Sequence, residues 1–314
     1  MSTAEKPLQV HHCLLMLNNI QTHILSCGSP FDCNGQDVII CIPGNPGIAD
    51  FYREFAVKLH RFTNLPLCIV GHAGHEVVPH EQSNVLKNQE HLFDLGGQIK
   101  HKVDFINKCI DSRSKLHFIG HSIGAWFILE ILQDHESILN RVASVNLLFP
   151  TLQKLGDTRN GKFITYFVQA IHSLVLFLFF LAYLLPDPVV FFLVKLYLNF
   201  NSYPMYNFIG VNKLLNVEVG EKMLHLAYDE MSNVKNLNVG VIDKIKHKTN
   251  VIYSSRDNWA PLSYMEDLKQ FEPEIKMKEV DIDHAFVLKS SETVADMVAQ
   301  FINPKSPEPY EKQE

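Results

Sequence analysis

The sequence lacks several features that define large classes of protein. Its six cysteines form no C-x-x-C pair, so redox and zinc motifs of that kind are excluded and we expect reduced thiols. No N-x-S/T glycosylation site occurs, and the apolar stretch near the N-terminus, residues 14–17, is too short for the core of a signal peptide. We therefore expect a chain that stays out of the secretory lumen and faces the cytosol.

The chain also has no excess of positive charge. Its 314 residues carry 28 Lys and Arg against 34 Asp and Glu, a net charge of −6, whereas binding to nucleic-acid phosphates needs a basic face. Charged residues make up 20% and hydrophobic residues 46%, which is typical of a globular protein and not of a disordered or polytopic membrane chain. We predict no nucleic-acid partner.

Short apolar runs alternate along the chain with segments that have helical spacing of apolar residues. The expected strands are residues 37–42, 65–70, 116–119, 142–149, 250–254 and 276–280. The expected helices are residues 50–62, 85–110, 123–132, 263–271 and 292–302. This order predicts an α/β fold with a mostly parallel sheet and helices on both faces.

The alternation is interrupted once, because residues 151–245 contain no clear strand. We predict an α/β core in two parts, residues 10–150 and 246–303, with residues 151–245 as a helical insertion. The Pro- and charge-rich tail, residues 304–314, is expected to be disordered.

A G-x-S-x-G motif spans residues 120–124. It lies between an expected strand and the helix that begins at Ile123, which is the setting in which this motif places a nucleophilic serine on a strained turn. The helix N-terminus behind Ser122 then presents backbone N–H groups to a developing oxyanion. A plain glycine-rich turn is the alternative, and the context favours the nucleophile.

The turn Pro-Gly-Asn-Pro-Gly, residues 43–47, follows the first expected strand. Its position suits the second N–H of an oxyanion hole, and we predict the backbone N–H of Asn45, paired with that of Ile123. Pro46 has no N–H, and Gly47 lies too far along the turn. Because Gly and Pro favour tight turns in general, an ordinary turn is the alternative.

A nucleophilic serine needs a base and an acid that orients the base. Asp257 and His284 each follow an expected strand, in the chain order Ser, acid, His, at strand ends where open α/β sheets place their chemistry. Asp281 and Asp283 are alternative acids, but neighbours in sequence rarely point at each other. We therefore predict Ser122, Asp257 and His284 as the catalytic residues.

Three histidines, His72, His75 and His80, lie close together in the sequence. They lack helical spacing and a carboxylate in register, so we expect a loop near the active-site mouth and not a metal site. His121, inside the serine motif, is expected to be packed or to line the pocket. We predict no metal ion and no other cofactor.

The longest hydrophobic run lies in the insertion. Residues 174–185 are 12 consecutive apolar residues, and a second run, residues 189–200, follows a Pro-Asp-Pro turn. The second run would be a helix of roughly 18 Å, too short to cross a bilayer. A single crossing would also place Ser122 on the opposite side from Asp257 and His284.

Three arrangements of these runs are consistent with the predicted site. One is a hydrophobic lid packed over the active site. The others are a pair of helices that lies at a lipid interface and a hairpin of residues 163–200 that inserts into a membrane or lipid surface, with Lys195 reaching back to the interface. A helix that is apolar on every side must bury all its faces, which favours the lipid surface.

The serine motif, the 43–47 turn, the Gly-His-Ala-Gly-His loop and the apolar insertion together resemble the lipid droplet-associated hydrolase family of the α/β-hydrolase superfamily. The resemblance covers about residues 10–303. It implies the α/β-hydrolase fold and a serine hydrolase of lipid esters, with sterol esters the usual proposal. It also implies a location on lipid droplets and the endoplasmic reticulum.

By matching position, the resemblance implies Ser122 as nucleophile, Asp257 as orienting acid and His284 as base. The turn before the acid, Ser254-Ser255-Arg256, departs from the Gly-x-x-Asp form that is common in the superfamily.

The resulting hypothesis is an ester hydrolase that acts on a lipid ester at a lipid droplet monolayer or endoplasmic reticulum membrane, which it contacts through residues 163–200. A lipid-surface protein that binds lipids or partners with little turnover is the alternative. An acyltransferase that uses the same acyl-enzyme is a third possibility.

Overall fold

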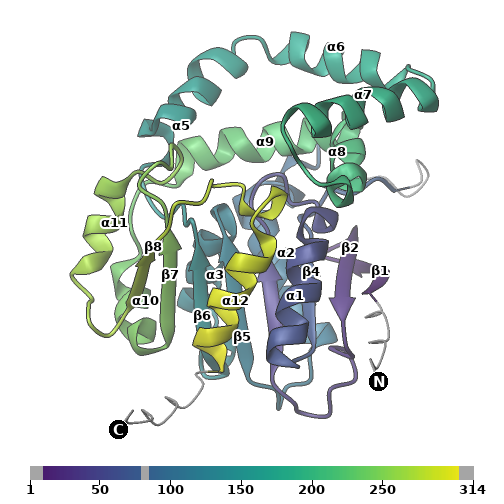
Figure 1. The fold of residues 1–314 in the computed structure, drawn as a ribbon. Coiled ribbons are helices and arrows are strands. Elements are labelled where there is room, and N and C mark those ends of the chain that lie inside the picture. Colours follow the sequence, from purple (N-terminus) through teal and green to yellow (C-terminus); the bar gives the residue numbers. More distant parts are fainter. Residues whose placement is uncertain (1–9, 79–84, 304–314) are drawn as a thin grey trace, which may run out of the picture.

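The computed structural model describes residues 10–78 and 85–303, and the tail predicted to be disordered lies outside the described residues. In the described part of the chain the strands form one eight-stranded sheet, in the order β1-β2-β4-β3-β5-β6-β7-β8 (Figure 1). The strands are β1 (Val10–Leu17), β2 (Ile20–Cys27), β3 (Val38–Ile42), β4 (Leu67–Val70), β5 (Leu116–His121), β6 (Val142–Leu148), β7 (Thr249–Tyr253) and β8 (Lys276–Glu279).

Six neighbouring strands of the sheet pair in parallel, as the alternation of strands and helices predicts. They are β4, β3, β5, β6, β7 and β8. All residues of β3, β4, β5 and β7 are buried. Strands that are covered on both faces read as nearly continuous apolar runs, and this is why they could be recognised in the sequence.

The N-terminal hairpin was not predicted. Strands β1 and β2 pair antiparallel, and β2 pairs antiparallel with β4. The turn between them consists of Asn18 and Asn19, both with positive φ, 46° and 63°, which is the backbone of a tight hairpin turn and is common for asparagine. In the sequence, the Asn-Asn pair between two runs of mixed polarity was the feature that could have predicted this hairpin.

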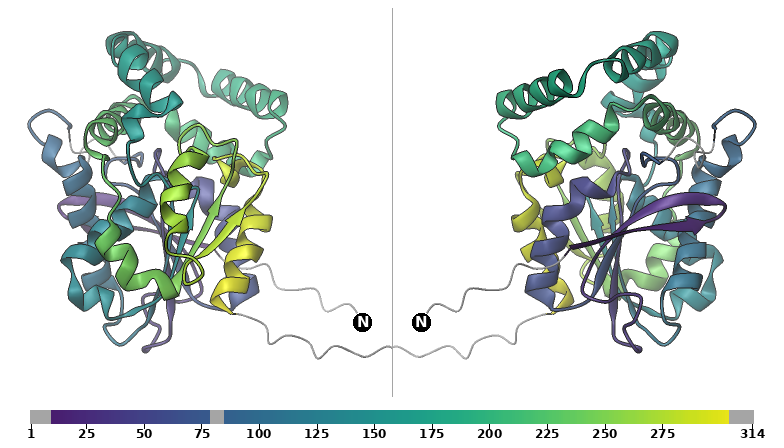
Figure 2. Two further views of the ribbon diagram at one scale, coloured as in Figure 1. Left: turned by 90° about the vertical axis from the view of Figure 1, so that its left-hand side faces the viewer. Right: turned by 90° about the vertical axis from the view of Figure 1, so that its right-hand side faces the viewer.

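Helices cover both faces of the sheet (Figures 1 and 2). Helices α1 and α12 pack through one apolar cluster, and α2, α3, α10 and α11 through another. The helices are α1 (Arg53–Thr63), α2 (Leu95–Cys109), α3 (Ile123–Asp134), α4 (Glu136–Leu139), α5 (Arg159–Phe163), α6 (His172–Tyr183), α7 (Asp187–Phe200), α8 (Phe208–Leu214), α9 (Val217–Asn233), α10 (Val239–Ile245), α11 (Leu262–Lys269) and α12 (Ser291–Ile302).

The helix expected at residues 85–110 begins ten residues later, so that part of the prediction is wrong. Helix α2 starts at Leu95, where the Asp94 side chain accepts a hydrogen bond from the Gly97 N–H at 2.7 Å. A Cβ on Gly97 would lie 2.5 Å from the backbone of Leu92. The preceding chain therefore folds back across the first turn of α2 and cannot extend the helix.

The insertion, residues 151–245, contains helices α5 to α10 and no strand. Helices α6 and α7 lie farthest from the sheet, and α9 lies between them and the end of the sheet where the parallel strands finish (Figures 1 and 2). Helix α10 returns to the core and packs against α3.

None of the described helices is by itself long and apolar enough to cross a membrane. By length and composition alone, one bent pair is a candidate, Arg159–Val168 followed by His172–Tyr183 at an angle of 86°.

Candidate active site

Ser122 lies at a sharp turn between β5 and α3. Its backbone angles, φ 53° and ψ −123°, fall in a region that side chains other than glycine rarely adopt. A Cβ on Gly120 would lie 2.6 Å from Ala125, and one on Gly124 would overlap the carbonyl oxygen of Ile42. The two glycines of the motif therefore allow the helix to pack directly on the strands and hold the serine in this conformation.

The structure brings the three predicted catalytic residues together from three loops at one edge of the sheet. His284 Nε2 lies 2.9 Å from Ser122 Oγ, and His284 Nδ1 lies 2.6 Å from Asp257 Oδ2. These distances are those of direct hydrogen bonds. Because Asp257 acts on one ring nitrogen and Ser122 on the other, the imidazole can carry a proton to or from the serine.

Asp257 is almost fully buried, yet it is held as a carboxylate. Burial raises the pKa of its carboxyl group, but the hydrogen bond from His284 and those from the backbone N–H groups of Trp259 and Ala260 lower it below the usual value overall. The backbone N–H groups bind Asp257 Oδ1 at 2.7 and 3.1 Å. Oδ2 is thereby left for the histidine.

His121 is buried behind the nucleophile and connects two loops. Its Nε2 lies 2.9 Å from the carbonyl oxygen of His284, and its Nδ1 lies 2.5 Å from the hydroxyl of Tyr52. Burial lowers the pKa of His121 to about 3, so the ring is neutral. It donates from Nε2 and accepts from Tyr52 through Nδ1.

Tyr52 was not singled out from the sequence. Its hydroxyl accepts a hydrogen bond from the Gly44 N–H at 2.8 Å while it donates to His121. One chain of hydrogen bonds therefore runs from the 43–47 turn through Tyr52 and His121 to the loop that carries His284. No local motif marks this tyrosine, which lies in the single 3₁₀ turn before α1.

The predicted oxyanion loop lies directly against the serine. A Cβ on Gly44 would lie 2.9 Å from the Cβ of Ser122. Among the described residues, neither the Asn45 nor the Ile123 backbone N–H donates a hydrogen bond. Both donors are thus available to a bound group, as an oxyanion hole requires.

An apolar cavity of about 680 Å³ extends from this edge of the sheet into the insertion. Ser122 and His284 line it, together with Asn45, Thr151 and Glu230. The walls are mostly aliphatic side chains of the insertion, including Val190, Val194, Leu214, Leu215, Met223 and Leu224. A cavity of this kind suits an apolar ligand with few polar groups.

The loop with His72 and His75 does not lie at the mouth of the cavity, contrary to the prediction. Both side chains are buried, 1% exposed, and neither lines the cavity. His75 Nδ1 accepts a hydrogen bond from the Gly47 N–H at 2.9 Å, and His72 packs where a Gly47 side chain would otherwise lie. They support the 43–47 turn from behind. His80 lies outside the described residues.

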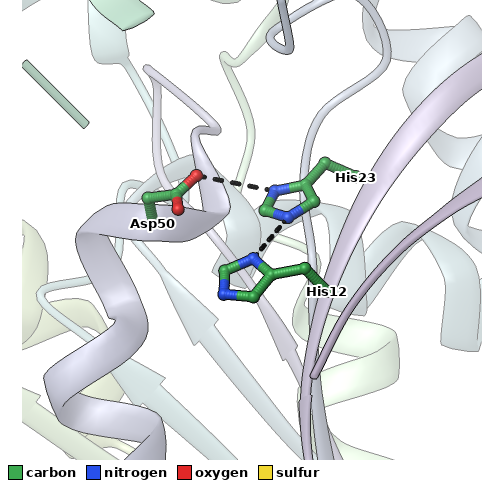
Figure 3. A group of neighbouring side chains, drawn as sticks. All are labelled: His12, His23 and Asp50. Atoms are coloured by element: carbon green, nitrogen blue, oxygen red, sulfur yellow. Dashed lines mark hydrogen bonds and ion pairs between the residues drawn. The ribbon is translucent and has the colours of Figure 1, made fainter. Parts of the chain in front are cut away.

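Three potential metal ligands, His12, His23 and Asp50, lie close together at the edge of the sheet (Figure 3). The two imidazoles hydrogen-bond to each other at 2.8 Å, so their lone pairs do not converge on a common point. The ammonium group of Lys213 lies 2.6 Å from Asp50 and 2.7 Å from Glu76. This lysine already occupies the Asp50 carboxylate, and the donor set does not fit a metal ion.

The model of the lipid-droplet associated hydrolase family matches residues 35–287, a stretch that includes Asn45, Ser122, Asp257 and His284. The chain belongs to this family. Its relatives include the lipid droplet-associated hydrolases of Drosophila melanogaster, 36% identical over 91% of this chain and 96% of the relative, and of Rattus norvegicus, 31% identical over 98% and 99%. The Homo sapiens protein of the same name is 29% identical over 95% and 96%.

Solved structures with the same fold confirm the predicted fold class for this lipid droplet-associated hydrolase family member. A thioesterase domain from the curacin biosynthetic pathway aligns with TM-score 0.62 and 13% identity, over 92% of this chain and 99% of that one. An α/β-hydrolase enzyme from a deep-sea metagenome library aligns with TM-score 0.61 and 12% identity, over 95% and 100%. The chain has the α/β-hydrolase fold.

Proposed function

We propose that this chain is a serine hydrolase that cleaves apolar lipid esters, with Ser122 as nucleophile, His284 as base and Asp257 as orienting acid. The observation that supports this most is the continuous hydrogen-bonded row from Asp257 through His284 to Ser122, whose last two members line an apolar cavity. The names of the relatives, lipid droplet-associated hydrolases, agree with a lipid substrate.

This geometry supports an acyl-enzyme mechanism. His284 Nε2 accepts the proton of Ser122 Oγ as that oxygen attacks the ester carbonyl, and the N–H groups of Ile123 and Asn45 stabilise the oxyanion. His284 then donates the proton to the oxygen of the leaving alcohol, and an acyl-enzyme forms. A water molecule, deprotonated by His284, attacks the acyl carbon. The bond between the acyl carbon and Ser122 Oγ then breaks, His284 returns the proton to Oγ, and the fatty acid leaves.

The cavity supports an ester with a large apolar part. Each methylene group that leaves water for its aliphatic walls contributes about 0.8 kcal/mol, and the walls offer few polar partners to a hydrophilic alcohol. Sterol esters fit this description, and we propose them as the substrates to test first, with acylglycerols as the comparison.

A fluorophosphonate probe tests the nucleophile. The probe should label the purified wild type in the presence of lipid, whereas Ser122→Ala and His284→Ala should not be labelled. Labelling of folded Ser122→Ala at the wild-type rate would overturn the assignment. A folded wild type that is not labelled would favour the second candidate, a lipid-surface protein that binds lipids or partners with little turnover.

We propose further that residues 163–200 contact the lipid droplet monolayer or the endoplasmic reticulum membrane from the cytosolic side. Helix α6 has no buried residue although it is almost entirely apolar. Phe177, Leu178 and Phe192 are each more than half exposed, and soluble proteins rarely leave contiguous apolar surface of this kind in water. The opposite side of α7 lines the cavity through Val190 and Val194, so the same hairpin would connect the lipid surface with Ser122.

Flotation with triolein droplets coated with phospholipid tests this contact. The triple variant Phe177→Glu, Leu178→Glu and Phe192→Glu should lower the droplet-bound fraction at least tenfold, because three buried charges oppose insertion. The matched control changes exposed apolar residues outside the insertion, Leu14→Glu, Met16→Glu and Phe62→Glu, and should bind as the wild type does. Equal binding of both triple variants would overturn the proposal.

A further inference from the structure

Glu230 is a buried carboxyl group in the wall of the cavity that Ser122 and His284 also line. It belongs to α9 of the insertion, is 5% exposed, and lines the cavity together with Ser122 and His284. A carboxyl group in an apolar cavity loses hydration, so it is costly there unless it has partners. The residues predicted from the sequence to carry the reaction do not include it.

The hydrogen-bond partner of Glu230 is the side chain of Asn45. Asn45 Nδ2 donates to Glu230 Oε1 at 3.0 Å and to the carbonyl oxygen of Met223 at 3.1 Å. Both acceptors belong to α9, so the side-chain amide ties the oxyanion loop of the core to one helix of the insertion. In the described part of the chain, these are the two hydrogen bonds of the Asn45 side chain, and its Oδ1 has no partner.

This connection lies one residue from the point where the loop meets the nucleophile. Gly44 packs on Ser122 so closely that a Cβ would lie 2.9 Å from the serine Cβ, and the Gly44 N–H is held by Tyr52. The loop is therefore fixed from the core side at Gly44 and from the insertion side at Asn45. A rotation of the Asn45 peptide would turn its N–H away from the site of the oxyanion.

We propose that Glu230 is a positioning residue which, from helix α9, holds Asn45 so that its backbone N–H points at the developing oxyanion on the Ser122-bound substrate. The inference rests on the proposed hydrolase function. It assigns to the insertion a part in the chemistry, in addition to its part in forming the cavity.

The protonation state of Glu230 matters for this role. Burial raises its pKa to about 8, the hydrogen bond from Asn45 lowers it, and the charge of Asp229 raises it. At pH 7 the carboxyl group is therefore mostly neutral, so little negative charge faces the forming oxyanion. The other ionisable groups on α9 are Glu218, Glu221, Lys222, His225, Tyr228 and Asp229. Those on the elements packed against α9 are Asp157, Tyr166, His172, Tyr183, Lys213, Lys100, His101, Lys102, Asp104, Lys108 and Cys109. Those that line the cavity with Glu230 are Tyr52, His121, Tyr197 and His284.

Two substitutions of Glu230 distinguish the effect of its hydrogen bond to Asn45 from the effect of its charge. Glu230→Gln resembles the neutral acid in shape and can still accept from Asn45 Nδ2, whereas Glu230→Leu cannot accept. Glu221→Leu, on the same helix and away from the cavity lining, is the control. The measured quantities are kcat and KM for p-nitrophenyl butyrate and the rate of fluorophosphonate labelling, each from pH 6 to 9.5.

At pH 7 we expect Glu230→Leu to lower kcat and the labelling rate about tenfold with KM changed less than twofold, since a displaced oxyanion donor costs less than the roughly 100-fold loss of a whole donor. Glu230→Gln should stay within about twofold of the wild type. Above pH 8 the wild type should lose activity relative to Glu230→Gln, because only the glutamate gains a charge.

Wild-type kcat in Glu230→Leu, or an equal loss in the Gln and Leu variants, would overturn the proposal. If Glu230→Leu does not fold, identical pH profiles of the wild type and Glu230→Gln above pH 8 would overturn it. A wild type that is not labelled at all is a failure of the proposed function, whereas a labelled wild type matched by Glu230→Leu is a failure of this inference alone.

Discussion

Asp257 differs from the two other acidic residues near His284 in its surroundings. It is 6% exposed and accepts from His284, Trp259 and Ala260. Asp281 pairs with Arg256 at the surface, and Asp283 is exposed. A buried carboxylate with its other oxygen already occupied can hold the imidazole in one tautomer, and a solvated one cannot do so with the same geometry.

We therefore expect Asp257→Asn to lower kcat about 10⁴-fold, because an amide can hold the histidine in the wrong tautomer. Asp283→Asn, the control, should stay within about twofold of the wild type. Steady-state hydrolysis of p-nitrophenyl butyrate measures both. The opposite order of the two variants would show that the acid has been misassigned.

At the scale of elements, the site depends on how closely β5 and α3 approach the neighbouring strand. Gly124, in the first turn of α3, lies against the end of β3, and a Cβ there would overlap the carbonyl oxygens of Ile42 and Pro43. Backbone atoms cannot move aside as the end of a flexible side chain can. The strand–turn–helix unit is thus compact because of its glycines, and the strained Ser122 backbone depends on that close contact.

Gly124→Ala should consequently lower the free energy of unfolding by more than about 3 kcal/mol or prevent folding, as expected when a backbone contact must break. Gly240→Ala is the contrasting variant, because nothing lies within 4 Å of its added Cβ in helix α10. Because Gly240 lies in the first turn of α10, the variant should raise stability by at most roughly 0.5–1 kcal/mol, the gain found in a helix interior. Urea unfolding followed by circular dichroism measures both, and a Gly124→Ala protein as stable as the wild type would contradict the packing argument.

At the scale of the whole molecule, a buried ion cluster joins the insertion to the core. Lys213 of α8 pairs with Asp50 beside the oxyanion loop and with Glu76 after β4, and His23 of the N-terminal hairpin lies 2.9 Å from Glu76. Figure 3 shows how His23 and Asp50 face each other from the hairpin and the 3₁₀ turn. Side chains from the insertion, the core and the hairpin therefore interact in one cluster, which holds these three parts of the molecule together.

Glu76 makes the stability of this arrangement depend on pH. Burial raises the pKa of its carboxyl group, but His23 and Lys213 lower it below 4.5 overall. A lowered pKa in the folded state means that the stabilisation is present above about pH 4.5 and is lost as the pH falls through the lowered pKa. Urea midpoints should show Glu76→Gln less stable than the wild type at pH 7, with the difference shrinking towards pH 3. Glu221→Gln should show no such trend, and a Glu76→Gln deficit that is constant with pH would contradict the assignment.

Much of the core could be predicted because its strands and helices carry local patterns. The buried parallel strands are continuous apolar runs, and the serine motif occurs at the junction of a strand and a helix. The N-terminal hairpin was missed because β1 is half exposed and reads as mixed polarity. The start of α2 was placed too early because a chain that folds back across a helix leaves no periodic signal of its own.

By itself the sequence determined the order of strands and helices, the turn that holds Ser122, and the spacing at which Asp257 and His284 follow. These properties depend on neighbours within a few residues or on the ends of parallel strands, which meet at one edge of a sheet. Only the tertiary structure decided that Tyr52 and His121 connect the loops and that Glu230 meets Asn45. Asn45 and Glu230 are 185 positions apart, and His121 and His284 are 163 apart. Such pairs are set by how the insertion packs on the sheet, and no periodicity along the chain records them.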